Sequence, residues 1–188
     1  MSSVVVIGDA LIDELRDDTG VREFVGGAAL NVAVGLSRLG VPTTLIAMVG
    51  DDDAGAKIRA YLADYGVELL ASPSVLGSSR AVSVRVDGEP TYVFNEAAQA
   101  RRLEFDPAQR AAIAHADRIV VSCYPFDDIE QTAQLIDAVG EASSRLVIDP
   151  NPRTGMMTDL DEFRRGFEAL ARGAGAVKIG DDDATLLY

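Results

Sequence analysis

The chain has 188 residues, of which 30 are acidic and 17 basic, so its formal net charge is −13. This length indicates one domain, and a content of 48% apolar and 25% charged residues excludes an intrinsically disordered chain. A chain this acidic, without a basic patch, is also a poor candidate for nucleic-acid binding.

Short apolar runs and helical patterns alternate through the first seventy residues. The β-branched run Val4–Ile7 predicts a buried strand. The expected elements that follow are a helix Asn31–Leu39, a strand Thr43–Val49, a helix Ala54–Tyr65 and a strand Val67–Leu70. Gly40 and Gly66 come directly after the two helical patterns, where glycine commonly ends a helix.

Two segments, residues 12–25 and 79–95, interrupt this alternation. Residues 12–25 have no helical periodicity, and Asp17–Gly20 is typical of a turn between two short strands. Ser79–Val86 alternates apolar and polar residues, Asp87-Gly88 is a strong turn signal, and Thr91–Phe94 resumes the strand pattern. We expect the two segments to form a small sheet outside the main one.

The alternation returns after Asp106-Pro107 and continues to the end of the sequence. The expected elements are the helix Pro107–His115, the strand Arg118–Ser122, the helix Ile129–Glu141, the strand Arg145–Ile148, the helix Leu160–Ala171, the strand Ala176–Ile179 and the helix Asp181–Tyr188. Apolar strands that alternate with helices predict an α/β fold, with a central, mostly parallel sheet flanked by helices. We find no linker, so residues 1–188 are expected to form one domain.

The sequence also bears on the cellular compartment. Cys123 is the one cysteine, so no internal disulfide can form, and its apolar neighbours predict a buried thiol. The amino-terminal apolar run is too short for a signal peptide, and no stretch approaches the ~20 apolar residues of a membrane span. We therefore expect a cytoplasmic protein without a membrane partner.

Three polar clusters follow predicted strands, where open α/β sheets bind their ligands. These clusters are Gly8–Asp13, Gly26–Asn31 and Asp149–Arg153. A dinucleotide enzyme is disfavoured because Asp9 would repel a pyrophosphate after the first strand, and the Gly-Lys-Ser/Thr of a Walker A loop is absent. The sequence also has no Gly-x-Ser-x-Gly elbow of a serine hydrolase.

The side chains of Asp9, Asp13 and Asn31 suit a ligand with several hydroxyl groups. A carboxylate accepts hydrogen bonds from two hydroxyls, and an amide both donates and accepts. The alternative is structural: Asp9 caps a turn and Asn31 caps a helix. Because the three residues lie together at predicted strand ends, we favour the binding site.

The same segments resemble a known family. The run Gly26–Ala33, followed by Gly40 and Gly50, is similar to the first signature of the ribokinase-like (PfkB) carbohydrate kinases. The segment Gly50–Gly55 resembles the Gly-x-Asp-x-x-Gly step after that signature. Asp149–Arg153 resembles the Asp-x-Asn-x-Arg segment of fructokinase-like and ketodeoxygluconate-kinase-like members.

The resemblance implies a ribokinase-like fold in which residues 12–25 and 79–95 form a β lid over the sugar site. It implies that Asp9 and Asn31 hold sugar hydroxyls and that Gly26 and Gly27 let the sugar approach closely. The further substrate-binding candidates are Asp13, Ala81, Phe94, Asn151 and Arg153, the last suited to an acidic or phosphorylated group. It also implies a homodimer that forms through the lid.

The nucleotide side is matched less well. Lys178 and Asp183 stand where the family approaches the phosphates of ATP and Mg²⁺, and Asp183 would act on the metal indirectly. Asp183 replaces the usual Glu, and Gly180 replaces Asn or Ser. The family's second signature, which carries its catalytic Asp and anion hole, has no counterpart here, so no catalytic residue is expected within this chain.

We therefore expect the sugar-binding, amino-terminal portion of an ATP-dependent carbohydrate kinase that phosphorylates a hydroxyl of a sugar or sugar acid, with the carboxy-terminal part absent. This portion alone is expected to be inactive. Two alternatives remain: a non-catalytic sugar-binding or regulatory remnant, and a nucleoside kinase.

Overall fold

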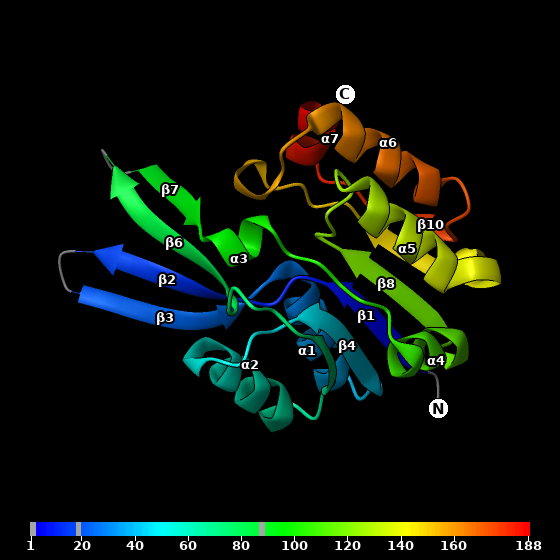
Figure 1. Cartoon of the computed structure of the whole chain (residues 1–188), viewed down its shortest axis with the longest axis horizontal. Coiled ribbons are helices and arrows are strands. Elements are labelled where there is room, and N and C mark those ends of the chain that lie inside the picture. Colours follow the sequence, from blue (N-terminus) through cyan, green and yellow to red (C-terminus); the bar gives the residue numbers. More distant parts are fainter. Residues whose placement is uncertain (1–2, 18–19, 87–88) are drawn as a thin grey trace.

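Two β-sheets organise the chain in the computed structural model, which describes residues 3–17, 20–86 and 89–188 (Figure 1). The larger sheet has six strands, all parallel. Their order across the sheet is β10 (Ala176–Val177), β9 (Leu146–Asp149), β8 (Arg118–Ser122), β1 (Val4–Gly8), β4 (Thr43–Met48) and β5 (Glu68–Ser72). This confirms the predicted α/β class with a parallel central sheet.

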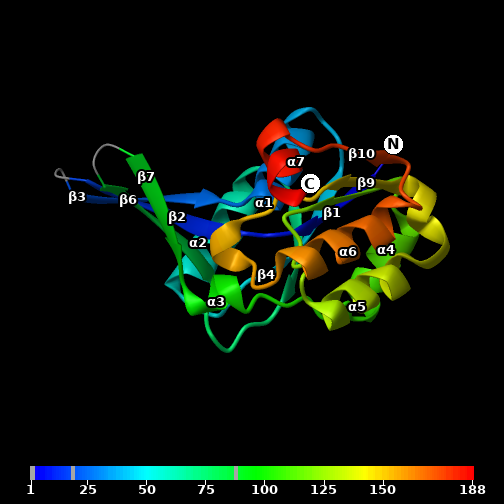
Figure 2. The same cartoon turned by 90° about the horizontal axis from the view of Figure 1, so that it is seen from above.

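Helices cover both faces of the central strands of the parallel sheet, whereas the edge strand β10 is exposed. The helices are α1 (Ala28–Arg38), α2 (Asp53–Asp64), α3 (Glu96–Gln99), α4 (Pro107–His115), α5 (Ile129–Val139), α6 (Leu160–Ala171) and α7 (Asp181–Leu187), with short 3-10 helices η1 (Gly140–Arg145) and η2 (Thr154–Met156). Helices α1 and α2 share one apolar cluster, whereas α4, α5 and α6 share the other. Figure 2 shows α4, α5 and α6 grouped together along the parallel sheet.

Strand β1 shows why the central strands are buried on both sides. Its side chains alternate in direction, so Val5 and Ile7 join the cluster of α4, α5 and α6, and Val4 and Val6 join that of α1 and α2. All residues of β1 are buried. A strand covered on both faces reads as a continuous apolar run, which is the pattern of Val4–Ile7.

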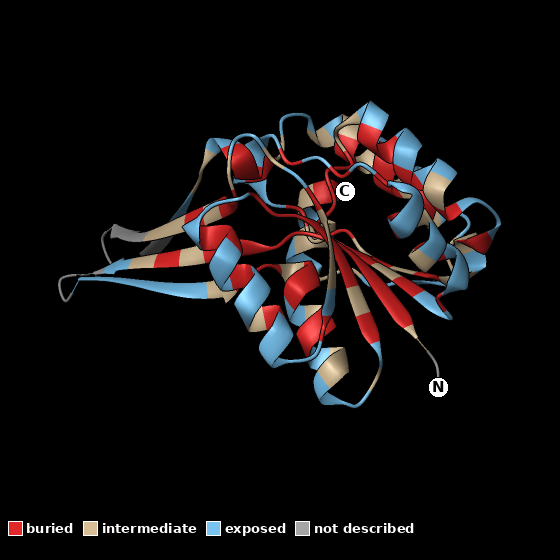
Figure 3. Ribbon diagram, turned by 60° about the horizontal axis from the view of Figure 1, so that its bottom comes forward, coloured by how far each residue is buried: buried red, intermediate tan, exposed pale blue. Residues whose placement is uncertain are grey.

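The smaller sheet, called the lid below, extends from one end of the parallel sheet. Its strands are β3 (Gly20–Gly26), β2 (Leu11–Asp17), β6 (Ser79–Val86) and β7 (Glu89–Phe94), in that order. β2 and β3 pair antiparallel, as do β6 and β7, and the two pairs meet through the parallel neighbours β2 and β6. The lid is visibly less buried than the parallel sheet (Figure 3). Both predicted lid segments thus lie in one sheet, and their predicted turns, at 18–19 and 87–88, lie outside the described residues.

Three predicted boundaries are wrong, each for a local reason. The helix expected at Asn31 begins at Ala28, because the backbone turns into it at Gly27. The helix after Ile129 ends at Val139, where Gly140 has a positive φ of 50° and a 3-10 helix follows. The last strand contains just Ala176 and Val177, since its backbone leaves the sheet after two residues.

The short helix α3 has no counterpart among the predicted elements. Asn95 begins it, and its Oδ1 atom accepts a hydrogen bond from the backbone N–H of Ala98 at 3.0 Å. Four residues are too few for helical periodicity, so a capping side chain was its one sequence signal. Within the described part of the chain, no helix is both long and apolar enough to cross a membrane.

Candidate functional site

A cavity of about 770 Å³ opens between the parallel sheet and the lid. It lies beyond the carboxyl end of β1, the strand from which the chain first proceeds to β4 and β5 on one side and later to β8, β9 and β10 on the other. Such a reversal of strand order leaves a crevice in which open α/β sheets bind ligands. The lining residues are Asp9, Leu11, Asp13, Gly27, Ala28, Asn31, Ala81, Tyr92, Phe94, Arg153, Thr154, Gly155 and Met156.

Asp9 follows β1 at the floor of this cavity and is 6% exposed. Its Oδ1 atom accepts a hydrogen bond of 2.9 Å from the backbone N–H of Ala29, in the first turn of α1. Burial raises the pKa of Asp9, while the bond from Ala29 and the positive charge of Arg101 act against that rise. The structural alternative for Asp9 is thus partly right, because the carboxylate does satisfy a helix amino terminus.

The two glycines before α1 allow the backbone to pass close to this carboxylate. Gly27 has a φ of +115°, and a Cβ atom there would lie 2.8 Å from the carbonyl oxygen of Asp9. A side chain on Gly26 would collide with Oδ2 of Asp13. Both positions therefore require glycine for packing, whatever the cavity binds.

One row of directly paired residues in the lid faces the cavity. Asp13 of β2 lies opposite Ala81 of β6 and opposite Phe24 of β3, and Ala81 lies opposite Phe94 of β7. Directly paired residues project from the same face of a sheet, so this register presents a carboxylate, a small buried side chain and an aromatic ring together. Three separately predicted residues, Asp13, Ala81 and Phe94, thereby reach one wall.

Asp13 and Arg153 give this wall opposite charges. Asp13 is half-buried, and burial, followed by the nearby negative charge of Asp9, raises its pKa, whereas Arg153 acts to lower it. The Arg153 side chain is exposed, and its Nη1 atom donates a hydrogen bond of 3.2 Å to the adjacent carbonyl of Pro152. The guanidinium is therefore available to an incoming anionic group.

The short helix η2 closes the side of the cavity next to the lid. A Cβ atom on Gly155 would lie 2.6 Å from the Phe94 ring, so the ring packs directly on the backbone of η2. Met156 is buried with Ala98 and Cys123 in a small apolar cluster that Phe94 covers. This packing fixes the orientation of the aromatic wall.

The cavity gathers most of the predicted substrate residues but not those for the nucleotide. Seven of the predicted residues line it: Asp9, Asp13, Gly27, Asn31, Ala81, Phe94 and Arg153. Gly26 packs on Asp13 just outside the lining, and Asn151, with a φ of 40°, also lies outside it. Lys178 donates a 2.9 Å hydrogen bond to Asp149, and Asp183 lies in the first turn of α7.

Asn31 is not the cap of α1, because the helix begins three residues earlier at Ala28. Its place in the cavity wall favours the binding hypothesis over the structural one. The lining residues missed by the sequence are Leu11, Ala28, Tyr92, Thr154, Gly155 and Met156. Period-two alternation from Asp13 and Phe94 could have identified Leu11 and Tyr92, whereas η2 has no comparable signal.

Mg²⁺ was expected to involve Asp183. Across residues 3–17, 20–86 and 89–188, no group of three or more histidine, cysteine, aspartate or glutamate side chains gathers as a metal-binding cluster. The predicted indirect contact of Asp183 with Mg²⁺ needs no such cluster and stays a prediction.

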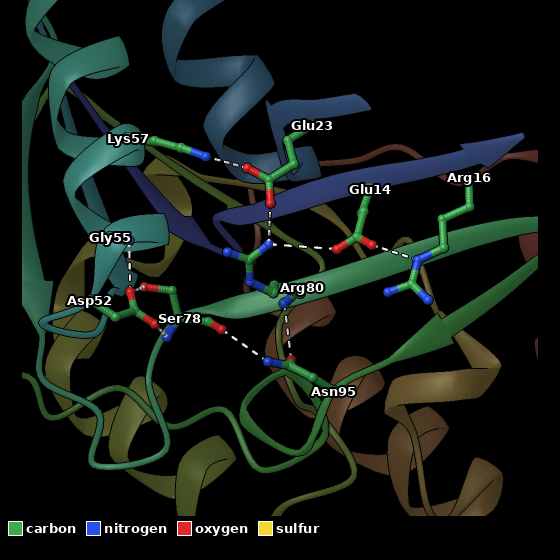
Figure 4. A network of polar contacts seen from close by, with 9 residues as sticks. All are labelled: Glu14, Arg16, Glu23, Asp52, Gly55, Lys57, Ser78, Arg80 and Asn95. Carbon is green, nitrogen blue, oxygen red and sulfur yellow. Dashed lines mark hydrogen bonds and ion pairs between the residues drawn. The ribbon is translucent and has the colours of Figure 1, made fainter. Parts of the chain in front are cut away.

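Polar contacts join the lid to the parallel domain at the edge of the site (Figure 4). Arg80 of β6 contacts Glu23 at 2.6 Å and Glu14 at 3.7 Å, and Lys57 of α2 pairs with the same Glu23. Glu23 thus links the lid to α2, a helix that packs on the parallel sheet. The charges of Lys57 and Arg80, acting mainly through their hydrogen bonds, lower the pKa of Glu23.

A second contact fixes the point where the chain enters β6. Asp52, the residue before α2, accepts hydrogen bonds from the backbone N–H of Gly55 at 2.7 Å and from the N–H and hydroxyl of Ser78 at 2.9 and 2.7 Å. Asn95 then links Ser78 and Arg80 across the start of the lid (Figure 4). These contacts determine where the lid begins relative to α2.

Comparisons with known proteins agree with this geometry. The profile described as pfkB family carbohydrate kinase matches residues 1–188. Fructokinase-1 of Zea mays is 29% identical over 203 residues, covering 98% of this chain and 62% of that protein. A fructokinase of Rhizobium leguminosarum bv. trifolii is 30% identical over 196 residues, covering 96% of this chain and 58% of that protein. The chain therefore spans about three fifths of the length of these curated relatives.

Solved structures share the fold. A Xylella fastidiosa fructokinase with bound ATP aligns with a TM-score of 0.81 at 20% identity, over all of this chain and 64% of that one. A double mutant of the Vibrio cholerae O395 fructokinase, bound to fructose, ADP and potassium ion, aligns with a TM-score of 0.78 at 22% identity, over all of this chain and 62% of that one.

Proposed function

This chain belongs to the pfkB family of carbohydrate kinases, and we propose that it forms the sugar-binding part of an ATP-dependent kinase that phosphorylates a sugar hydroxyl. The observation that carries the proposal is the cavity between the lid and the parallel sheet, which brings Asp9, Asp13 and Asn31 together. The fructokinase names of the relatives make fructose the first sugar to test.

Hydrogen bonding gives this cavity its preference for a polyol. The free lone pairs of Asp9, beyond the bond from Ala29, accept hydrogen bonds from sugar hydroxyls. Asn31 donates and accepts, and Asp13 approaches from the lid. A ligand that lacks the matching hydroxyls would leave buried carboxylate oxygens without partners, which strongly disfavours it.

Arg153 extends the proposal to acidic sugars. The exposed guanidinium on the cavity wall can bind a carboxylate or phosphate in two parallel hydrogen bonds. Asn151, two residues before Arg153, stays a predicted contact, although it does not line the cavity.

The phosphate side of the proposal rests on the family resemblance. By this resemblance, Lys178 and Asp183 approach the phosphates of ATP, which binds together with its Mg²⁺. Lys178 is already paired with Asp149, so it would have to exchange this carboxylate for a phosphate. We assign no residue of the chain as the base that takes the hydroxyl proton, and propose that the chain alone does not transfer phosphate.

Titration calorimetry with the 188-residue chain tests sugar binding. The panel contains fructose, aldoses, a ketodeoxy sugar acid and nucleosides. We expect a sugar or sugar acid to bind and the Asp9→Ala and Asn31→Ala variants to lose at least about tenfold in affinity. Asp137→Ala, on the exposed part of α5, is the control that should not change binding.

Other outcomes of that panel contradict the proposal in different ways. Binding of nucleosides alone would indicate a nucleoside kinase. Binding of no ligand would reject the cavity as a sugar site. Sugar-dependent ADP release by the chain itself would overturn the proposal that it is inactive and would also exclude a non-catalytic remnant.

We also propose that two copies associate through the lid. Apolar side chains more than half exposed lie on the two edge strands of the lid, β3 and β7: Val21 and Val93 on the face away from the cavity, and Phe24 and Tyr92 on the cavity face. Light scattering coupled to size exclusion should give a dimer mass for the wild-type chain and a monomer mass for Val21→Asp/Val93→Asp. A monomeric wild type would refute this. A cytoplasmic location stays a prediction.

A further inference from the structure

Arg101 is a buried cation outside the cavity lining. It is 7% exposed, and within the described residues it forms no ion pair with a carboxylate. Its neighbour Arg102 is exposed and paired with Asp128 and Glu130. Burying a guanidinium without a paired anion costs desolvation free energy, so the buried Arg101 side chain needs a compensating negative charge nearby.

The hydrogen bonds of Arg101 hold two backbone segments behind the cavity floor. Nη1 donates to the carbonyl of Ala98 in α3 at 3.2 Å, and Nη2 donates to the carbonyl of Cys123 after β8 at 3.3 Å. Nε is buried and has no hydrogen-bond partner in the part of the chain that the structure describes. The side chain therefore joins the segment leaving the lid to the end of a central strand.

Cys123, whose carbonyl accepts a hydrogen bond from Arg101, connects Arg101 to Asp9. The backbone of Cys123 has a φ of 50°, which is unfavourable for a residue other than glycine. The hydrogen bond from Arg101 to the Cys123 carbonyl helps to hold the backbone in this conformation. Burial, and then the charge of Asp9 and a hydrogen bond from the thiol to Asp9, raise the pKa of Cys123 to about 12. The neutral thiol therefore adds no charge beside Asp9.

Few charged groups face Asp9. Asp13 lies on the lid side and Arg153 in the segment before η2. Backbone N–H groups face Asp9 from the first turn of α1, and the charge of Arg101 acts on it from the segment after α3. Asp13 is itself acidic and Arg153 is exposed, whereas Arg101 is buried and its positive charge acts to lower the pKa of Asp9.

We propose that Arg101 is a positioning residue that, through its charge and through Cys123, holds the Asp9 carboxylate in place as the acceptor for a sugar hydroxyl. This inference rests on the proposed sugar site. It assigns to Arg101 no contact with the sugar.

Carbon-13 NMR of the aspartate carboxyls tests the proposal without any sugar, so its failure is separate from failure of the proposed function. The pKa of Asp9 is measured in the wild-type chain and in the Arg101→Met, Arg101→Lys and Arg101→Gln variants. We expect Arg101→Met to raise it by about one pH unit, and Arg101→Lys to leave it near the wild-type value. Arg102→Met, the same change at the exposed neighbour, is the matched control and should have no effect.

Arg101→Gln keeps donors for the two carbonyls but not the charge, and it decides the question if Arg101→Met does not fold. An unchanged Asp9 pKa in either neutral variant would overturn the proposal. So would an equal rise in Arg101→Lys or Arg102→Met, because the effect would then not depend on charge at position 101. Where the wild type binds fructose, the pH below which binding is lost should rise with the Asp9 pKa.

Discussion

The parallel sheet and the lid use β-structure in opposite ways. Each residue of β1 is buried, and helices cover both faces of the central strands of the parallel sheet. Strand β3 of the lid is exposed over most of its length, and the lid is joined to α2 through ion pairs and hydrogen bonds. Apolar burial fixes the first region, whereas the lid combines the apolar contact of Ile12, which packs in the cluster of α1 and α2, with polar contacts that water and salt weaken.

This difference separates stability from recognition. Burial contributes about 25 cal/mol for each Å² of apolar surface, so substitutions in the parallel sheet affect the free energy of unfolding most. The cavity takes its selective groups partly from the lid, through Asp13, Ala81 and Phe94. A region that moves at low free-energy cost is suited to admit a ligand and then exclude water around it.

The largest effect is expected in the parallel sheet. Leu45 in β4 is fully buried, and Leu45→Ala should lower the free energy of unfolding by about 3 kcal/mol, through lost transfer energy and the cavity it leaves. Urea unfolding followed by circular dichroism measures this. Val21→Ala in the lid, where the side chain is exposed, should change the value by at most about 0.5 kcal/mol. Equal losses at both sites would contradict the comparison.

The next largest effect concerns the junction between the two regions. Asp52→Ala removes the acceptor for Gly55 and Ser78 and should lower the free energy of unfolding by about 2 kcal/mol. Amide exchange should rise in β6 more than in β8. Asp106→Ala, which removes the cap of α4 far from the lid, is the matched control and should leave exchange in β6 unchanged.

The Asp52 contribution should also depend on pH. Burial acts to raise the pKa of Asp52, but hydrogen bonds from Ser78 and Gly55 outweigh it and lower the pKa below its ordinary value. A carboxyl with a lowered folded-state pKa stabilises the fold above its unfolded pKa and loses that effect as pH falls through the folded value. The stability gap between wild type and Asp52→Asn should therefore narrow in acid. A constant gap from pH 7 to pH 2 would exclude this.

Asp13 should separate binding from stability. Asp13→Asn is expected to weaken binding of the sugar by about tenfold, or ~1.4 kcal/mol, in calorimetry. Because burial and the charge of Asp9 raise the pKa of Asp13, its ionised form costs stability above its unfolded pKa. The variant should therefore unfold at the same or a slightly higher temperature at pH 7. A less stable Asp13→Asn variant with unchanged sugar binding would contradict the assignment of the lid to binding and of the parallel sheet to stability.

The smallest effect is expected at the exposed pair of Lys57 and Glu23. Lys57→Met should change the free energy of unfolding by no more than about 0.5 kcal/mol, since exposed ion pairs contribute little. It should reduce the salt dependence of amide exchange in β3. Arg165→Met, which breaks the exposed pair with Glu162 on α6, serves as the control and should leave β3 unaffected. A large loss of stability would show that the pair does more than hold the lid.

The sequence predicted the elements well where a single period governs the pattern. Alternating burial gives β1 its apolar run, and it also distinguishes the two lid segments from helices. Boundaries were less predictable, because the start of α1 depends on the backbone at Gly27 and the end of the last strand depends on a neighbour in the sheet.

The site could be predicted where residues follow strands, and less so where tertiary contacts select them. Asp9 follows the central strand, so its place at the cavity floor was foreseeable. Arg101 and Arg102 are identical neighbours, yet one is buried and the other exposed, and no local pattern separates them. The roles of Lys178 and Asp183 stay predictions, because both residues lie outside the cavity.

The register of the lid has an evolutionary consequence. Asp13, Ala81 and Phe94 share one face because they are directly paired, and side-chain direction reverses with each residue. Inserting or deleting one residue between Leu11 and Asp13 would turn Asp13 and the later side chains of β2 to the opposite face while leaving the parallel sheet intact. Substitutions can therefore change the selectivity of such a lid gradually. A change in strand length keeps the side chains on their face only when residues are inserted or deleted two at a time.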